Sequence, residues 1–236
     1  MVHSKTGAAA LIVGLLMAST AMAEQRVLKY FADYDANPLA GMEALIADFE
    51  AANPDVDVQL QNFDHEGYKT AIRNFLTTDS PDLANWYAGN RMAPFVKAGQ
   101  FMDVSDVWEA NGLGDSLASA KASMTIDGKQ WGVPYTYYQW GIYFNKDVYK
   151  QVGAEVPTNW DGFIANCALF KAAGIDCLTT GTSALWPGAG IFDYMSLRTN
   201  GYEWHMDLTA GKIAWTDQKT RDVFAQWAKL VEPGYI

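Results

Sequence analysis

In the first part of the chain, segments with the apolar pattern of a strand alternate with segments whose apolar residues have helical spacing. Val27–Phe31 is a short apolar run, apolar and polar residues alternate over Val56–Leu60, and a third apolar run covers Leu83–Tyr87, as is typical of strands. Helical spacing links the apolar residues after each run: Leu39, Met42, Leu45, Ile46 and Phe49, then Tyr68, Ile72, Phe75 and Leu76, then Met92, Phe95 and Val96. This β-α-β-α-β-α order predicts an α/β fold with a parallel sheet and right-handed crossovers.

The second half of the chain has a mainly helical pattern. Thr158–Asp161 resembles a capping box and opens a helix. Ile175–Thr179 is expected to be a strand, and Leu185–Gly188 a loop that leads into the next helix. A last helix is expected from about Asp217 to Val231. The side chains expected to face inward from it are Val223, Phe224 and Trp227.

An aromatic segment, Asp127–Tyr149, lies between these halves. Asp127-Gly128 is a favoured hairpin-turn pair, and Asn145 suits the N-cap of a helix. The aromatic residues between them are Trp131, Tyr135, Tyr137, Tyr138, Trp140, Tyr143 and Phe144. Such residues favour a buried pair of strands. Phenols next to Gln139 would also suit a cleft for a hydroxyl-rich ligand, in which case the segment crosses between two lobes and lines the gap.

The N-terminus has the pattern of a secretory signal peptide. Lys5 precedes a short apolar run over Ala8–Met17, and Ala21–Ala23 is a small-x-small cleavage site. The run is too short to span a bilayer. We expect cleavage after Ala23 and export to the periplasm, without a lipid anchor, since no Cys follows the cleavage site.

Charge and cysteine content narrow the possible partners. The chain of 236 residues has a formal net charge of −10, which argues against nucleic acid and anionic membranes as partners. Cys167 and Cys177 are its two cysteines. In an exported protein such a pair favours a disulfide, the alternative being two buried thiols that never meet.

Polar and aromatic residues gather where the predicted strands end. Asp33, Tyr34 and Asp35 follow the first strand, Asp64 and His65 the second, and Trp86 and Tyr87 close the third. Ligands of open α/β sheets bind outside these carboxyl ends. Carboxylates accept hydrogen bonds from sugar hydroxyls, and aromatic faces cover the C–H face of a sugar ring. Turn and N-cap chemistry for the aspartates, and core packing for Trp86, are the alternatives.

Several motifs in series carry a resemblance to a known family. They are Ser80–Trp86, Lys97–Val104, Trp131–Tyr135, Ile142–Asp147, Val156–Asp161, Lys171–Ile175, Phe192–Tyr194, Arg198–Gly201 and Gly211–Asp217. In order and spacing the chain resembles the carbohydrate-specific solute-binding proteins of ABC importers, the maltodextrin-binding-protein-like group.

The resemblance implies a periplasmic-binding-protein fold of the type II kind, with two α/β lobes that close on a sugar. It implies a first lobe over 24–133, a crossing segment over 134–140 and a second lobe over 141–236. Family members are longer, because their chains return to both lobes, so this chain is expected to be truncated at its C-terminus, with the return segments missing. The residues expected to contact the ligand are Asp33, Tyr34, His65, Trp86, Tyr137, Tyr138, Gln139 and Trp186.

The expected ligand is a mono- or oligosaccharide, and the expected partners are the membrane permease subunits of an ABC importer. We expect a monomer that uses no cofactor or metal and performs no catalysis. Two alternatives stay open. An exported glycoside hydrolase would need two carboxylates about 5–10 Å apart across the scissile bond. A sugar-sensing receptor module would need only the ligand site and no transporter.

Overall fold

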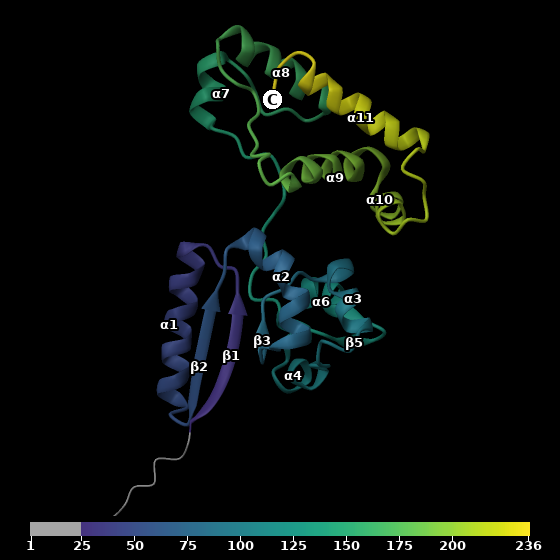
Figure 1. Cartoon of the computed structure of the whole chain (residues 1–236). Helices are drawn as coiled ribbons and strands as arrows, with labels where there is room; N and C mark the ends of the chain where they lie inside the picture. Colours follow the sequence, from purple (N-terminus) through teal and green to yellow (C-terminus); the bar gives the residue numbers. More distant parts are fainter. Residues whose placement is uncertain (1–24) are drawn as a thin grey trace, which may run out of the picture. The chain divides into compact units, whose positions relative to one another are not determined.

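A computed structural model describes residues 25–236, and the expected signal peptide and its cleavage site lie outside them. The chain divides into two compact units, one ending at Pro134 and the other beginning at Tyr135 (Figure 1). The function of 134–140 as a crossing segment between lobes stays a prediction. Within the described residues, no helix is both long and apolar enough to cross a membrane.

The first unit is built on a parallel sheet, as predicted. Its strands β1 (Arg26–Ala32), β2 (Val56–Asn62) and β3 (Leu83–Ala84) lie in the order β2-β1-β3. β1 pairs with β2 along its whole length, from Arg26 opposite Val56 to Ala32 opposite Asn62. The third strand is shorter than expected, because only Tyr30 and Phe31 of β1 pair with it. The helices α1 (Ala36–Ala52) and α2 (His65–Thr78) connect the strands.

Aromatic rings from the sheet and helices form the core of this unit. The buried members are Phe31, Tyr68, Ile72 and Phe95. The Tyr68 hydroxyl donates to the carbonyl oxygen of Asn85 at 2.8 Å and to that of Phe31 at 3.2 Å. These bonds satisfy a hydroxyl that burial has removed from water, and the same burial raises the pKa of Tyr68 above its ordinary value. The core thereby fixes the ends of β1 and β3 together.

Short helices and a hairpin complete the unit. They are the 3₁₀ turn η1 (Gly89–Arg91), α3 (Ala93–Lys97), α4 (Ser105–Ala110), α5 (Leu113–Ser116), α6 (Ala118–Met124), β4 (Thr125–Ile126) and β5 (Lys129–Gln130). The hairpin turn at Asp127-Gly128 is confirmed, with φ of 51° and 78° at the two residues. The helices between Ser105 and Met124 had no counterpart in the sequence prediction.

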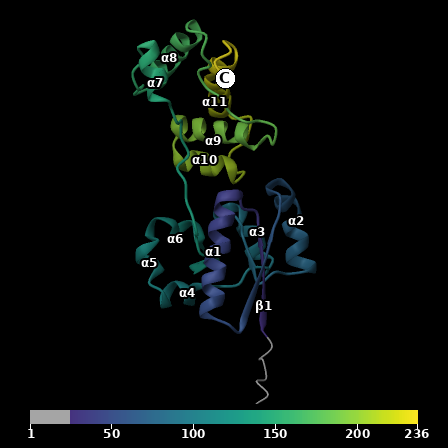
Figure 2. The ribbon, with the colours of Figure 1, turned by 90° about the vertical axis from the view of Figure 1, so that its left-hand side faces the viewer.

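The regular elements of the second unit are all helices, with irregular segments between them. Its helices are α7 (Lys146–Val152), α8 (Trp160–Ala172), α9 (Trp186–Asn200), α10 (Tyr202–Thr209) and α11 (Gln218–Val231). α9 packs against α10 and α11 (Figures 1 and 2). The buried clusters are Phe192, Met195, Leu208 and Val223, and Phe163, Cys167 and Leu230, with Trp160 and Trp227 packed against both.

Two expectations for this unit are wrong. Ile175–Thr179 forms no strand. A strand needs a hydrogen-bonded neighbouring strand. Here the Leu178 amide donates to the Tyr235 carbonyl at 3.0 Å, and the Ile175 amide donates back to the Phe170 carbonyl of α8 at 2.9 Å. Phe224 was expected to face inward from the last helix, yet 49% of it is exposed. Val223 is buried beside it, because the two side chains point about 100° apart around the helix.

Helix starts were predicted more accurately. Asn145 is the N-cap of α7, and its side chain accepts from the amides of Asp147 and Val148 at 2.9 and 3.3 Å. The cap of α8 is Asn159 rather than Thr158, and it accepts from the Gly162 amide at 2.8 Å. Both caps satisfy amides that have no partner inside the helix.

Candidate functional site

The carboxyl ends of β1 and β2 bring Asp33 and His65 into contact. Asp33 follows β1, and His65 is the first residue of α2, directly after β2. His65 Nδ1 and Asp33 Oδ2 are 2.8 Å apart. The Asp33 side chain is 14% exposed and that of His65 is 40% exposed, so the imidazole is the more accessible partner. Asp64 is instead the N-cap of α2, and its side chain accepts a hydrogen bond from the Gly67 amide at 2.9 Å.

The contact continues to the residues after β3. The Tyr87 hydroxyl lies 3.2 Å from His65 Nε2. In the neutral tautomer whose Nδ1–H donates to Asp33, the Nε2 atom of His65 carries no proton and can accept a hydrogen bond from the Tyr87 hydroxyl. The Arg91 guanidinium carbon lies 3.7 Å from the centre of the Tyr87 ring, so Arg91 is the last residue in this series of contacts. We call Asp33, His65, Tyr87 and Arg91 the strand-end cluster.

Two members of the strand-end cluster were not among the predicted ligand contacts. Tyr87 was noted only as part of the third strand end, and Arg91 was not considered. The signal that points to Tyr87 is a second aromatic residue directly after Trp86. Nothing local points to Arg91, because its approach to Tyr87 depends on the 3₁₀ turn η1 that carries it.

Tyr34 lies in the interior of the first unit. It is 7% exposed, and its amide donates to Asn62 Oδ1 at 2.7 Å. Its hydroxyl meets that of Tyr30, which donates to Asn85 Oδ1 at 2.7 Å. The Asn85 side-chain nitrogen is buried and has no hydrogen-bond partner among the described residues. Tyr34 therefore supports the strand ends from behind rather than presenting its ring to solvent.

Trp86 has one side in the core and one side toward Arg91. Its ring meets Phe95 edge-on at 5.4 Å and Tyr68 at 6.3 Å between ring centres. Its indole nitrogen donates to the Arg91 carbonyl oxygen at 2.9 Å, and the Arg91 guanidinium carbon lies 5.4 Å from the ring centre. Core packing, one of the two alternatives from the sequence, therefore applies to one side of this half-buried ring, and contact of Trp86 with a ligand stays a prediction.

The crossing segment exposes its phenols. Tyr137 is 92% exposed and Tyr138 is 77% exposed. Gln139 is exposed too, and its carbonyl oxygen accepts from the Tyr143 hydroxyl at 2.9 Å. No strand forms between Trp131 and Phe144, so the alternative of a buried strand pair is wrong.

Trp186 is the first residue of α9 rather than part of a loop. It is 47% exposed, and its ring centre lies 6.2 Å from that of Trp140, with the two planes tilted by 55°. These two rings and the exposed phenols all belong to the second unit. They form a group separate from the strand-end cluster of the first unit, which also carries Trp86.

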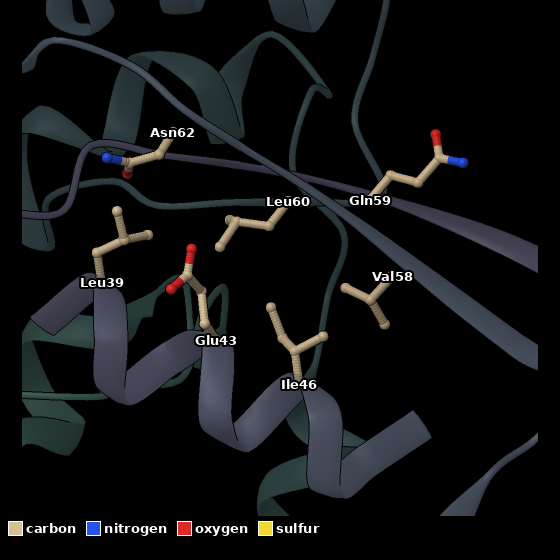
Figure 3. A pocket seen from close by; sticks show the side chains of 7 residues that line it. All are labelled: Leu39, Glu43, Ile46, Val58, Gln59, Leu60 and Asn62. Atoms are coloured by element: carbon tan, nitrogen blue, oxygen red, sulfur yellow. The ribbon is translucent and has the colours of Figure 1, made fainter. Parts of the chain in front are cut away.

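The hollows of the first unit lie away from the candidate residues. One of about 480 Å³ opens between α1 and β2, where Leu39, Glu43 and Ile46 point toward the strand (Figure 3). Its other lining residues are Val58, Gln59, Leu60 and Asn62. It contains no residue of the strand-end cluster, so we do not assign it to the site. Among residues 25–236, no group of three potential metal ligands occurs.

A disulfide joins Cys167 of α8 to Cys177, with Cα atoms 4.9 Å apart. Cys167 is fully buried in the cluster of Phe163 and Leu230. The bond ties the irregular segment after α8 to the helix, and it confirms the pairing favoured by the sequence. No free cysteine occurs among the described residues.

The chain is similar in sequence and in fold to solute-binding and sugar-binding proteins. The sequence profile of bacterial extracellular solute-binding proteins matches residues 34–234. A multiple sugar-binding protein of Streptococcus mutans is 31% identical over 134 residues, covering 56% of this chain and 31% of that protein. The structure of the bacterial solute receptor AcbH, reported with an exclusive preference for β-D-galactopyranose, matches with a TM-score of 0.77 at 30% identity. That match covers 86% of this chain and 52% of AcbH.

A chitin oligosaccharide binding protein matches with a TM-score of 0.78 at 25% identity, covering 89% of this chain and 53% of that protein. The chain therefore shares the fold of two-lobe solute-binding proteins. It spans about half the length of the relatives that it matches.

Proposed function

Because the chain belongs to the bacterial extracellular solute-binding protein family, we propose that it binds a mono- or oligosaccharide outside the cytoplasm and delivers it to the permease of an ABC importer. The strand-end cluster is the observation that carries this proposal. It places a carboxylate, an imidazole, a phenol and a guanidinium within contact of one another at the ligand-binding end of a parallel sheet.

The chemistry of these groups suits a neutral polyhydroxyl ligand. Sugar hydroxyls both donate and accept, so they can bond to a carboxylate, an imidazole and a guanidinium at once. The relatives named for multiple sugars, galactopyranose and chitin oligosaccharides support a sugar rather than another polar ligand. Trp86 and Trp186 would add the apolar surface that covers a ring face.

We further propose that the ligand draws the two units together. Asp33, His65 and Trp86 belong to the unit that ends at Pro134, whereas Tyr137, Tyr138, Gln139 and Trp186 belong to the one that follows. A sugar that contacts both sets would bind a closed arrangement more tightly than an open one. That difference in affinity would shift the population toward closure about the 134–140 segment. Binding would leave the sugar chemically unchanged.

Export completes the proposal. Cleavage after Ala23 would release a periplasmic chain that begins at Glu24 and meets the permease as a monomer. A sensing role without transport would need the same site. Stimulation of a permease's ATPase by the sugar-loaded chain, and not by the empty one, would favour transport.

A thermal-shift screen of the purified chain tests the proposal. A sugar at 100 times its Kd should stabilise the fold by about 2.7 kcal/mol. Galactose and chitin oligosaccharides are suitable first ligands, and Asp33→Asn should abolish most of the shift, because it removes the carboxylate that contacts His65. Asp35→Asn is the matched control, since Asp35 is exposed and makes no cap hydrogen bond to α1.

Failure of every sugar to raise the melting temperature would reject the proposed ligand class. Sugar cleavage during the incubation would instead establish the glycoside hydrolase alternative. An equal shift in Asp33→Asn and in Asp35→Asn would show that the strand-end cluster is not the binding site.

A further inference from the structure

The Trp140 indole lies against the backbone of α9 at Gly190. A Cβ at Gly190 would lie 2.5 Å from Trp140 Cζ2 and 2.9 Å from Cη2, distances too short for any side chain. Gly188, on the same helix, has no heavy atom within 4 Å of its Cβ position. Neither glycine has a positive φ, so backbone conformation does not require them. The contact with Trp140 is what distinguishes Gly190 from Gly188.

Trp140 also contacts Trp186, and this connects the glycine to the proposed ligand group. Trp186 and Gly190 are four residues apart on α9 and therefore lie on one face of the helix. The Trp140 ring reaches both positions, with its edge on Gly190 and its centre 6.2 Å from that of Trp186. It is 44% exposed, so more than half of its surface is used in packing.

The chain before Trp186 gives its ring little support. Leu185 has a φ of 64° and a side chain that is 78% exposed. The Trp186 amide donates to the Ala184 carbonyl at 2.8 Å, which closes a tight turn centred on Leu185. The Leu185 side chain is thus mostly exposed, and the ring that contacts the Trp186 indole is that of Trp140.

We propose that Gly190 and Trp140 are positioning residues that hold the Trp186 indole in one orientation for stacking on a sugar ring. The inference rests on the proposed function and assigns residues that it does not include. A ring fixed before the ligand arrives loses less side-chain freedom on binding, so the complex is tighter. Gly190 is needed because a methyl group there would push Trp140 off the helix and release Trp186.

A pair of glycine substitutions tests this proposal on the exported chain. Gly190→Ala and Gly188→Ala add the same methyl group to the same helix, so their effects on helix propensity are matched. We expect Gly190→Ala to weaken binding of the tested sugar about tenfold, which is about 1.4 kcal/mol, and Gly188→Ala to leave it unchanged. The measurement is a calorimetric titration with galactose or a chitin oligosaccharide, whichever gives the larger melting shift, well below both melting temperatures.

A size exchange then separates positioning from a general loss of structure. Trp140→Phe in the Gly190→Ala protein makes room for the added methyl group, and we expect it to restore most of the lost affinity. Equal affinity of the two alanine variants would overturn the proposal, as would a double variant that binds as weakly as Gly190→Ala. Failure of the unsubstituted chain to bind either sugar would be visible before any variant is compared, and it would count against the proposed function itself.

Discussion

At the scale of single residues, the structure gives Trp86 two roles that one substitution can measure. Its ring packs on Phe95 and Tyr68 while its other side meets Arg91. Trp86→Ala should therefore lower the free energy of unfolding by about 2–3 kcal/mol, less than for a fully buried Trp. It should also weaken sugar binding by about 1–3 kcal/mol if the ring stacks on the ligand. Urea unfolding and calorimetric titration measure the two losses.

Tyr87→Phe is the companion variant, because it removes only the hydroxyl that meets His65. It should weaken binding with little loss of stability. A Trp86→Ala protein that loses stability but keeps its affinity would place Trp86 in the core alone.

Asp103 makes a second residue-scale prediction, which concerns pH. Lys129 Nζ lies 2.8 Å from Asp103 Oδ2, and Ser105 donates to Oδ1 from its amide at 3.0 Å and its hydroxyl at 2.6 Å. The ion pair with Lys129, followed by the Ser105 bonds, lowers the pKa of Asp103 to about 2. A lowered pKa in the folded state means that the carboxylate stabilises the fold above its unfolded pKa of about 3.9.

That stabilisation is lost as the pH falls from about 4 through about 2. The melting temperature of Asp103→Asn should therefore lie below that of the unsubstituted chain at pH 5–7, and the difference should shrink as the pH falls below 4 and vanish below about pH 2. Asp48→Asn, at an exposed position of α1, serves as the control. A constant difference across this range would show that Asp103 acts without its charge.

Residue chemistry was predictable wherever it is local. The Asp127-Gly128 turn and the Asn145 cap depend on neighbours within a few residues, and both are present. The sequence predicted that Asp33 and His65 lie at the same edge of the sheet, but it did not predict their contact. The approach of Arg91 to Tyr87 was not anticipated, because it depends on where η1 lies in space. Tyr34 is buried with its hydroxyl against that of Tyr30, which the sequence did not predict, and its contact with the ligand stays a prediction.

At the scale of elements, periodicity located the long helices and the paired strands, and it missed the short helices. The sequence predicted β1 and β2 correctly, because both are long strands and each pairs with the other. Ile175–Thr179 has the composition of a strand but no strand beside it among the described residues. The short helices α4, α5 and α6 span 4 to 7 residues each, too few for an apolar period to be visible. Strand formation depends on a partner, which no local pattern contains.

Helix α1 makes a prediction at this scale. Its pattern is apolar, yet it has no buried residue, and Leu45 and Phe49 are 61% and 45% exposed. Ile46 instead points toward β2 beside Leu60 (Figure 3). Ile46→Ala should cost about 1–2 kcal/mol, because it removes partly buried methyl groups. Leu45→Ala should stay within about 0.5 kcal/mol.

Urea midpoints of the two variants provide the measurement, and each serves as the control for the other because both leave alanine on the same helix. Equal losses at Leu45 and Ile46 would show that the outer face of α1 is covered in solution.

At the scale of the whole molecule, the two units raise the question of how a sugar would bring them together. The segment that joins them begins at Pro134, whose ring restricts φ, and continues through Tyr135–Phe144 without regular structure. A joint of this kind can change its backbone angles with no loss of helix or strand. The family resemblance predicted two units and a connection near this point, and movement of the units about it stays a prediction.

The last prediction is that the right sugar lowers the radius of gyration of the exported chain. To take the population from about 1% closed to about 99% closed, the sugar must bind the closed form about 10⁴-fold more tightly, or by about 5.5 kcal/mol. Contacts with one unit alone cannot supply that difference, because they are the same in the open and closed forms. Contacts that Trp186 or Tyr138 make only after closure can. Small-angle scattering across a sugar titration should therefore give profiles that are sums of two limiting curves.

Trp186→Ala should still bind through the strand-end cluster, more weakly, and should show little fall in radius at saturation. A sugar that raises the melting temperature while leaving the radius unchanged would keep the binding proposal and defeat closure. The variant separates these outcomes because it removes a contact from the second unit while leaving Asp33, His65 and Tyr87 of the first unit intact.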